Sequence, residues 1–321
     1  MCRNHKMRLA LTIAFVLIMQ GLSFAQHAEN FVHIYDSRES YNPASMGMNK
    51  CGEFTFIDRR QWTGFDGAPV ANMIAFSNHS KPSVHGHFHA YGLNMVREEY
   101  GYFQSLVVRP SYAYHLRTRR DFHLSAGIGV GIRKQRTGYN TVNPSSANYD
   151  PASSRGQNLL QAPDITAGLW LYHNYFFTGL SMKHILNNQF TIGGLNNGAD
   201  INYPRTYFLT LGHEHESIHY YYTYVYSLLL RFVPYQLPAI DLNIRYLIKR
   251  QFGFGLSLRN FNSVAGMLEY TYDRKFKIGY AYERSIGNLS RLAKNSHEVV
   301  FTYYLCPSGL RPKESRCPAY K

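Results

Sequence analysis

Apolar and polar residues alternate along most of the chain beyond residue 50. From Asp121 to Arg133, every even position is apolar and every odd position is polar or glycine. Successive side chains of a β-strand point to opposite faces, so this pattern predicts a strand with one apolar and one polar face. The alternation lasts for thirteen residues. It is long enough for a tilted crossing of a bilayer, for which about 9–11 residues suffice.

The chain contains fourteen segments that we predict as strands. Their spans are 51–61, 69–78, 84–96, 101–115, 121–136, 163–172, 175–185, 203–215, 218–231, 239–248, 251–260, 262–271, 275–286 and 295–305. All even-numbered connections are five residues or fewer, whereas the long connections, 137–162 and 186–202, are odd-numbered. An even strand number with short turns at one end and longer loops at the other is typical of outer-membrane barrels. We therefore predict an all-β fold, a transmembrane antiparallel β-barrel of the outer membrane with about 14 strands.

The polar faces of several predicted strands carry charged residues, such as Arg245 and Arg259. A solvent-facing sheet of a soluble sandwich and the charged lumen of a barrel both explain this pattern. The composition favours the barrel, because the chain has 27 Tyr and 20 Phe but only 17% charged residues. Tyrosine enrichment fits a surface that is apolar in the middle and wet at both rims.

The first 25 residues have the features of a secretory signal peptide. Basic residues precede an apolar core from Leu9 to Met19, and Ser23-Phe24-Ala25 forms a small-residue cleavage site. We expect the mature chain to consist of a periplasmic N-terminal segment (26–50), the barrel (51–305) and a periplasmic C-terminal tail (306–321). The strand count then places both long loops outside the cell. The lipid of the outer membrane is one expected partner.

The hydropathy of the chain excludes membrane-spanning helices, and its charge pattern gives no sign of nucleic-acid binding. Outside the signal, no apolar run approaches the roughly 20 residues of a membrane-spanning helix. The net charge of +14 falls to +11 after removal of Arg3, Lys6 and Arg8. The remaining cations are scattered, and an exported protein rarely meets nucleic acid, so we expect no nucleic-acid partner.

The mature chain has three cysteines, Cys51, Cys306 and Cys317. In an oxidising periplasm, Cys306 and Cys317 are the first candidates for a disulfide, because each precedes a proline and they would close a small loop. Cys51 then stays free, or replaces one of them as a rival partner.

One motif matches a zinc-hydrolase signature. His215-Glu216-Ser217-Ile218-His219 has the spacing H-E-x-x-H, which requires both histidines on one face of a helix. The flanks, 206–211 and 220–225, are rich in β-branched and aromatic residues, which favour strands. We therefore interpret the motif as strand, turn and strand.

Two other patterns have a structural interpretation as well as a functional one. His85, His87 and His89 would share one face of a strand and form a conceivable metal site. The alternative, which we favour, is that they line the lumen. The glycines 127, 129 and 131 have the wrong spacing for dinucleotide binding, and we interpret them as small lumen-facing residues.

The turn from Arg59 to Pro69 is the best candidate for partner binding. It combines two glycines, a proline and two large aromatics between predicted strands. Trp62 and Phe65 could anchor a partner, as exposed aromatics do in interface centres, or belong to the aromatic girdle of the barrel. Asp66 and Pro69 complete this candidate site.

Several motifs, taken in order, resemble those of the PorP/SprF family. They are Asn42 to Gly47, the turn from Arg59 to Pro69, Pro163-Asp164-Ile165 with Gly168, Tyr175 to Ser181, His184 to Asn188, Asp241-Leu242-Asn243, Tyr280-Ala281-Tyr282 and Ser296-His297-Glu298. The stretch from Tyr35 to Tyr41 departs from the family, because it is more polar than the expected lead-in.

The resemblance implies an outer-membrane protein of the type IX secretion system of the Bacteroidetes, without catalytic activity, cofactor or metal site. It implies docking or support of cargo proteins with C-terminal secretion domains, including those of gliding motility, and secretion components as partners. The alternative is a passive porin or small-solute channel. Large inward side chains or an N-terminus that plugs the lumen would count against a channel.

Overall fold

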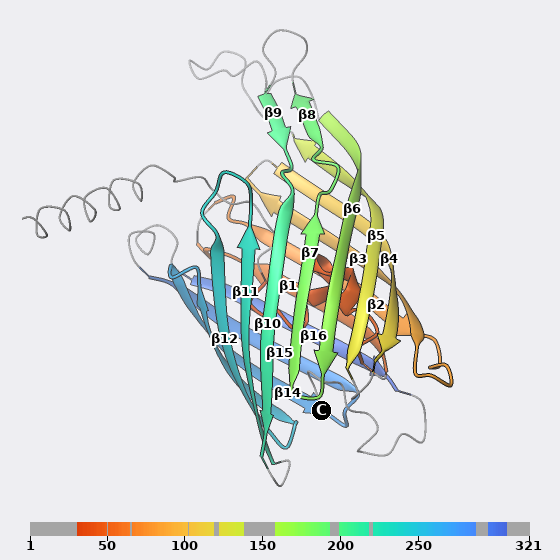
Figure 1. Cartoon of the computed structure of the whole chain (residues 1–321). Coiled ribbons are helices and arrows are strands. Elements are labelled where there is room, and N and C mark those ends of the chain that lie inside the picture. The colour runs from red at the N-terminus through yellow and green to blue at the C-terminus, as the bar shows by residue number, and fades with distance from the viewer. Residues whose placement is uncertain are drawn as a thin grey trace, which may run out of the picture.

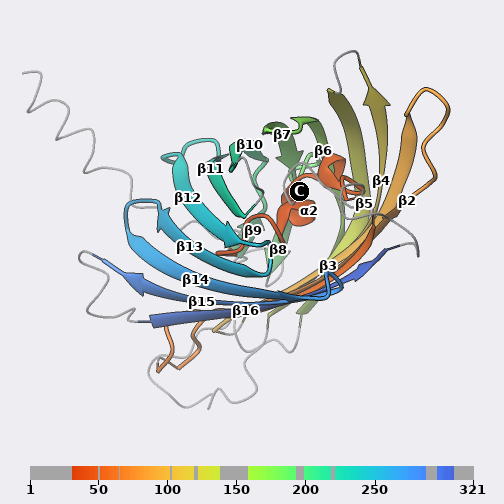
Figure 2. The same cartoon turned by 90° about the horizontal axis from the view of Figure 1, so that it is seen from below.

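Fourteen antiparallel strands close into one barrel (Figures 1 and 2). The computed structural model describes residues 31–49, 51–64, 66–101, 103–118, 122–137, 158–192, 199–217, 221–286 and 295–306. The barrel strands are β1 (Gly52–Arg60), β2 (Val70–His79), β3 (Phe88–Tyr100), β4 (Phe103–Arg117), β5 (His123–Thr137), β6 (Asn158–His173), β7 (Phe176–Lys183), β10 (Thr206–Glu216), β11 (Tyr222–Phe232), β12 (Ala239–Ile248), β13 (Phe252–Arg259), β14 (Ser263–Tyr272), β15 (Phe276–Ser285) and β16 (Asn295–Leu305). This confirms the predicted fold class. Within the described ranges, no helix is both long and apolar enough to cross a membrane.

The barrel has two distinct ends. The connections 61–69 and 184–205 lie at one of them, called the long-loop end. The other, called the short-turn end, carries turns such as 174–175 and 249–251. The segment 186–202 was predicted as a loop, but it contains a separate two-stranded sheet of β8 (Gln189–Ile192) and β9 (Ala199–Asn202).

The two faces of the wall differ as the alternation predicted. On β5, Ile128, Val130 and Ile132 point outward and are exposed. Lumen-facing residues are buried and often charged, for example Arg109 on β4 and Asp164 on β6. Aromatic side chains of neighbouring strands pair on the outer surface near the short-turn end, for example Tyr222 with Tyr246 and Phe276 with Tyr303. An apolar outer band with aromatic rims suits a bilayer.

The N-terminal segment lies inside the barrel. Every residue from 31 to 49 is buried, and Figure 2 shows the short helix α2 (Arg38–Tyr41) within the ring of strands. A 3₁₀-helix, η1 (Pro43–Ser45), follows it. We expected residues 26–50 outside the barrel, in the periplasm. The described part, residues 31–49, is instead a plug, because its polar residues find partners on the charged inner wall.

Glycines on the wall make room for the plug. A Cβ atom on Gly127 of β5 would lie 2.5 Å from the backbone nitrogen of Ala44 in η1. A Cβ atom on Gly168 of β6 would collide with the Asn42 side chain. Close backbone approach of this kind requires glycine. The interpretation of the β5 glycines as small lumen-facing residues therefore holds at Gly127.

The disulfide differs from the first expectation. Cys51 is bonded to Cys306, with their Cα atoms 4.3 Å apart. The expected pair, Cys306 with Cys317, is therefore wrong in this structure, and the rival partner Cys51 takes its place. The reason is the register of the closing strands, which sets Gly52 opposite Leu305 and so brings the next residues together. Cys317 lies outside the described residues.

Candidate functional site

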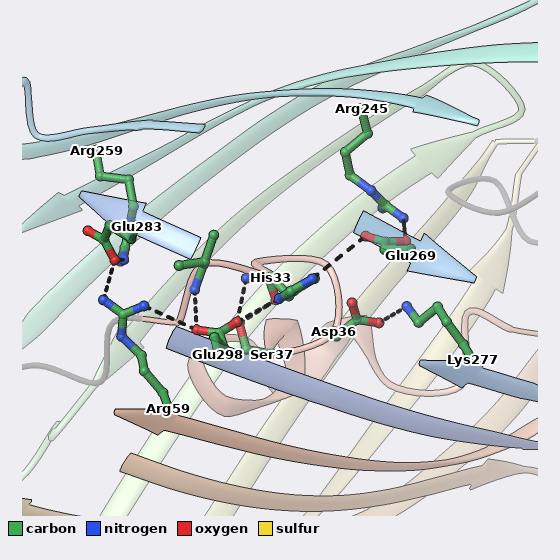
Figure 3. A network of polar contacts seen from close by, with 11 residues as sticks. His33, Asp36, Ser37, Arg59, Arg245, Arg259, Glu269, Lys277, Glu283 and Glu298 are labelled. Atoms are coloured by element: carbon green, nitrogen blue, oxygen red, sulfur yellow. Dashed lines mark hydrogen bonds and ion pairs between the residues drawn. The ribbon is translucent and has the colours of Figure 1, made fainter. Parts of the chain in front are cut away.

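The Glu298 carboxylate holds the beginning of the plug. Glu298 lies on β16 and is fully buried. Its carboxylate accepts hydrogen bonds from the backbone N–H groups of Val32 at 2.7 Å and His33 at 2.8 Å. The His33 ring nitrogen Nδ1 lies 2.7 Å from the same carboxylate (Figure 3). Three contacts from two adjacent residues fix this end of the plug in position and orientation.

Buried arginines extend this contact along the wall. Arg59 on β1 reaches both Glu298, at 3.3 Å, and Glu283 on β15. Arg259 on β13 contacts the same Glu283 oxygen at 2.9 Å. The carboxylate–guanidinium chain in Figure 3 therefore joins β1, β13, β15 and β16 to the plug.

A second branch holds the middle of the plug. Asp36 forms an ion pair with Lys277 on β15. The Arg245 guanidinium of β12 lies 4.7 Å from the ring centroid of Tyr35 and pairs with Glu269 of β14. Cation–π contact and ion pairing thus act together on consecutive plug residues.

Charges in this network, which we call the plug network, nearly balance. Its permanent cations and carboxylates are Arg59, Arg245, Arg259 and Lys277 against Asp36, Asp241, Glu269, Glu283 and Glu298. His33 lies between Glu298 and Glu269, and it supplies a fifth positive charge when protonated. Buried pairs add little net stability, because desolvation offsets their attraction. Removal of one partner, however, costs about 3–5 kcal/mol. The plug network therefore fixes the plug in one position in the lumen.

Helix α2 is held against β1 and β2. The Arg38 guanidinium donates to Glu53 of β1 at 2.7 Å and also to the Tyr35 carbonyl. Glu39 accepts from the Ser77 hydroxyl of β2 at 2.7 Å. Arg38 lies 4.0 Å from Glu39. Two buried carboxylates thus share one guanidinium.

Ser40 and Asn42, in the central part of the plug, are held by the opposite wall. Arg109 of β4 donates to the Ser40 carbonyl at 2.6 Å and pairs with Asp164 of β6 at 3.0 Å. The Asn42 side-chain amide donates to the backbone carbonyls of Leu169 and Leu180, on β6 and β7. The plug therefore bridges the lumen from β16 to β6 and β7.

Apolar contacts between the plug and the wall also hold the plug in place. Phe31 packs with Ile57, Met73 and Val300 of the wall. The Tyr41 ring stacks on Phe208 of β10 with centroids 5.4 Å apart. Burial of aromatic side chains stabilises by roughly 1.5–3 kcal/mol each. The plug is thus held by both charge pairing and packing.

The candidate partner-binding turn lies at the long-loop end. The backbone N–H of Trp62 donates to the Ser296 hydroxyl at 3.2 Å, and the Trp62 side chain is half-buried. Asp66 is exposed and Pro69 is half-buried. Phe65 lies outside the described residues. The structure therefore places three of the four candidates in one turn at one end of the barrel.

The H-E-x-x-H motif does not form a helical face. His215 lies on β10 and points outward, whereas Glu216, the last residue of that strand, pairs with Arg250. His219 lies outside the described residues. In the described part of the chain, no group of three or more His, Cys, Asp or Glu side chains is placed to hold a metal ion.

The three alternating histidines do not line the lumen, which corrects that interpretation. His85 and His89 are exposed and His87 is half-exposed, whereas Phe88 between them points inward onto His115. β3 begins only at Phe88, so His85 and His87 lie in the connection before the strand. On the strand itself, Phe88 takes the inward position and His89 points outward. His89 lies 2.6 Å from the Tyr112 hydroxyl on the outer surface.

The plug network was not among the residues predicted as a site. Its wall members carried a signal, because Arg245 and Arg259 are charged residues at polar-face positions of strands. Its plug members, His33 and Asp36, carried almost none, since they lie in a polar stretch without periodicity. The unusual polarity of Tyr35 to Tyr41 was the visible trace of their role.

Comparisons with known proteins agree with this architecture. The toluene transporter TbuX of Ralstonia pickettii matches with 12% identity and a TM-score of 0.52, over 84% of this chain and 93% of that chain. The CymD monoaromatic hydrocarbon channel matches with 10% identity and a TM-score of 0.52, over 90% of this chain and 96% of that chain. At such identities the likeness shows the barrel fold alone. No curated protein matches the chain.

A family model agrees with the motifs noted in the sequence. The model described as type IX secretion system membrane protein PorP/SprF matches residues 23–303, nearly the whole barrel and its plug. This family of secretion membrane proteins and the barrel fold together place the protein in the outer membrane. This chain belongs to the PorP/SprF family of type IX secretion system membrane proteins.

Proposed function

We propose that this protein docks cargo of type IX secretion at the outer membrane and catalyses no reaction. The cargo class is exported protein with a C-terminal secretion domain, including adhesins of gliding motility. Docking takes place at the long-loop end, which faces the cell exterior, while the short-turn end and the C-terminal tail face the periplasm.

The observation that carries this proposal is the buried plug. Residues 31–49 are buried throughout and bridge the lumen between opposite walls. A folded protein domain cannot pass a lumen occupied in this way, so cargo must engage the ends of the barrel. A second candidate, a passive channel, requires that the plug leave its seat, and the buried plug network opposes that.

The turn from Arg59 to Pro69 offers contacts for a docked domain. Asp66 is exposed, and Trp62 presents a half-buried ring at the same end as the sheet of β8 and β9. The turn is held in place, because the Gly101 backbone N–H donates to the Gly67 carbonyl at 2.9 Å. A rigid turn with an aromatic anchor binds a partner without a large loss of conformational entropy.

The test is copurification of a secreted cargo domain with the tagged protein. We expect Trp62→Ala combined with Asp66→Asn to weaken cargo binding by about thirtyfold, which corresponds to one lost hot spot of about 2 kcal/mol. The matched control is Tyr272→Ala combined with Asp273→Asn, which removes an exposed ring and a charge at the short-turn end. Unchanged cargo binding in the Trp62 variant, with its barrel intact, would contradict docking at this turn.

A further inference from the structure

Two neighbouring hairpin tips at the short-turn end carry basic residues. They are Lys249-Arg250-Gln251 between β12 and β13, and Asp273-Arg274-Lys275 between β14 and β15. The two tips lie next to each other, because the backbone N–H of Thr271, near the end of β14, donates to the Gln251 carbonyl at 2.7 Å. We call the segments 249–251 and 273–275 the basic tips.

The basic tips hold more cations than the carboxylates around them balance. Arg250 pairs with Glu216, the last residue of β10, and Lys275 pairs with Asp273 at 3.2 Å. These two ion pairs leave Lys249 and Arg274, so the four cations and two carboxylates carry a net charge of +2. The side chains of Lys249 and Arg274 are exposed. The excess charge therefore lies on the surface, where an anionic partner can reach it.

The backbone of the basic tips is unfavourable for the residues that occupy it. The first two residues of each tip have positive φ, which is 49° at Lys249, 56° at Arg250, 45° at Asp273 and 54° at Arg274. Glycine and asparagine adopt this conformation with less strain than lysine or arginine. The long basic side chains therefore do not help the turns to form. Strained residues of this kind are retained mainly where they serve a function.

Hairpins of the same part of the wall have uncharged tips at the long-loop end. The connection 233–238, between β11 and β12, contains no charged residue, and the connection 260–262, between β13 and β14, is Asn-Phe-Asn. Asn260 and Phe261 also have positive φ, 45° and 54°. The same kind of turn thus forms there without a cation. The basic residues mark one end of the barrel and are not a requirement of the turn.

The order of side chains along the strands places the basic tips at the headgroup level of a bilayer. Lys275 is followed on β15 by Phe276 and Ile278, which point outward and are exposed. The other basic tip is followed on β13 by the exposed Phe252 and Leu256. In both cases the cations come first, then an aromatic ring, then an aliphatic side chain. Outward aromatic rings of barrels lie at the membrane–water interface. Cations directly beyond the rings therefore reach the phosphate groups of lipids.

We propose that the basic tips bind the phosphate group of an anionic phospholipid in the leaflet at the short-turn end, with Lys249 and Arg274 as the main cationic partners. A lipid fits these cations better than an acidic protein, because they directly follow lipid-facing rings along the strands. With the proposed orientation of the barrel, this is the periplasmic leaflet. The recognition of the lipid does not depend on the docking of cargo.

The test measures the binding of short-chain lipids to the purified full protein in an uncharged detergent by isothermal titration, with protein-free micelles as the blank. The probes are dihexanoyl phosphatidylglycerol, which has a net negative charge, and dihexanoyl phosphatidylcholine, which has none. We expect phosphatidylglycerol to bind about tenfold more tightly at about 0.1 M salt. The difference should shrink at about 1 M salt, because the charges are then screened. Equal binding of the two lipids at the lower salt would overturn the proposal and leave an acidic protein as the partner.

A double variant removes the two excess cations and keeps the turns. Lys249→Asn combined with Arg274→Asn introduces residues that tolerate positive φ. We expect the preference for phosphatidylglycerol to fall by about fivefold or more, while the temperature of unfolding stays the same or rises. A lower temperature of unfolding would show that the cations serve folding, and it would overturn the proposal.

The matched control removes two exposed cations at the long-loop end. Arg60→Asn combined with Arg97→Asn changes side chains that are 68% and 55% exposed. This control should keep the preference for phosphatidylglycerol. An equal loss of preference in both double variants would mean that only the net charge of the protein matters, and the basic tips would not be the site.

A soluble headgroup identifies the carrier of the phosphate. Glycerol 1-phosphate has the phosphate without acyl chains, and we expect it to bind at least about tenfold more weakly than dihexanoyl phosphatidylglycerol, because the chains add apolar contact. Equally tight binding would assign the basic tips to a free phosphate compound and overturn the choice of a lipid. A preference for phosphatidylglycerol in a protein that never copurifies with cargo would support lipid binding and remove only the docking function.

Discussion

At the scale of single residues, a few buried charges decide where the plug lies. Glu298 receives three contacts from Val32 and His33, and it also faces Arg59. None of these contacts is exposed to bulk solvent, so each partner left alone would be a buried, uncompensated polar group. Such residues contribute less to net stability than to the choice of one arrangement.

Replacement of Glu298 should loosen the plug and leave the barrel closed. Glu298→Gln keeps the shape but removes the charge that faces Arg59 and His33. We expect a loss of about 3 kcal/mol in the anchoring of the plug. Hydrogen exchange of residues 31–49 at constant pH should then be faster by roughly a hundredfold.

Glu99→Gln is the matched control for Glu298→Gln. Glu99 pairs with Arg97 on the surface, with side chains exposed by 32% and 55%, where a pair contributes about 0–1 kcal/mol. Glu99→Gln should leave the hydrogen exchange of the plug unchanged. Equal exchange in both variants would show that Glu298 does not anchor the plug.

Glu39 should make the stability of the plugged barrel sensitive to pH. It belongs to the plug and not to a membrane-crossing strand. Burial raises the pKa of its carboxyl to about 7 against the lowering effect of Arg38, and the Glu53 carboxylate adds to the rise. A carboxyl with a raised folded-state pKa stabilises the fold at low pH, and this contribution is lost as the pH rises through about 7.

The temperature of unfolding should therefore be higher at pH 6 than at pH 8. Glu39→Gln should reduce this difference, because its side chain stays neutral at both values. Glu99→Gln, a surface carboxylate, should retain it. If Glu39→Gln kept the full difference in unfolding temperature between pH 6 and pH 8, groups other than Glu39 would be responsible for it.

At the scale of elements, the plug and the wall are shaped for each other. The short helix α2 and the 3₁₀-helix η1 lie against wall strands that carry glycine at the points of closest approach. The wall could be closed without these glycines, but the plug could not lie where it does. Their conformational freedom matters less than the absence of a side chain.

A side chain at Gly127 should displace η1. The Cβ atom of valine would lie 2.5 Å from the Ala44 nitrogen, so backbone atoms would have to move. Overpacking of this kind costs about 1–3 kcal/mol. Protease sensitivity of residues 31–49 should rise in Gly127→Val.

Gly266→Val is the matched control for Gly127→Val. Gly266 is also a strand glycine, on β14, and a Cβ atom there meets nothing within 4 Å. Its plug should stay as protected as in the unchanged protein. Equal protease sensitivity of the two variants would remove the steric explanation.

The disulfide joins the two strands that close the barrel. Cys51 precedes β1 and Cys306 follows β16, a separation of 255 residues in the chain. A crosslink over so long a loop is expected to stabilise by about 5–6 kcal/mol in the chain-entropy model. Replacement of Cys51 and Cys306 by serine should lower the midpoint of denaturant unfolding.

Cys317 provides the control for this pairing. Cys317→Ser should leave the unfolding midpoint unchanged, and peptide mapping without reductant should recover Cys51 linked to Cys306. Recovery of Cys306 linked to Cys317 instead would contradict the structure.

At the scale of the whole molecule, the barrel is a wall around an occupied lumen. The plug contacts wall strands on opposite sides, including β4, β6, β15 and β16. The outer surface meets lipid, and the two ends remain for partners. An occupied lumen with two accessible ends suits the docking of partners better than the passage of solutes.

The conductance of the protein in planar bilayers should reflect its occupied lumen. The intact protein should show no stable, large open currents. Deletion of residues 31–49 should produce them if the barrel still closes, because barrels wider than about 8 strands enclose space that their own side chains do not fill. Large currents from the intact protein would favour the channel function.

Much of the fold could be predicted from local patterns. The predicted strand 239–248 coincides with β12 (Ala239–Ile248), and 295–305 coincides with β16 (Asn295–Leu305). Alternation is a property of neighbouring residues, so it is visible without any knowledge of distant contacts. The sheet of β8 and β9 was missed, since two short strands leave little periodic signal.

The candidate site was predicted less well. The turn at Trp62 was visible because its composition is unusual, yet the Trp62 side chain is only partly exposed. The plug network was not visible, because its members come from the plug and from strands that are far apart in the sequence. Charges such as Arg245 could be placed on the inner face, but their partners could not.

The sequence by itself determined the fourteen strands of the wall, most of their inward and outward faces, the barrel class and the family, because these follow from alternation and ordered motifs along the chain. Only the tertiary structure decided that residues 31–49 fill the lumen, that Cys51 pairs with Cys306, and that His89 points outward while His85 and His87 lie outside β3. Each of these depends on the register between distant strands or on the space inside a closed wall. Neither quantity is a property of any short stretch of sequence.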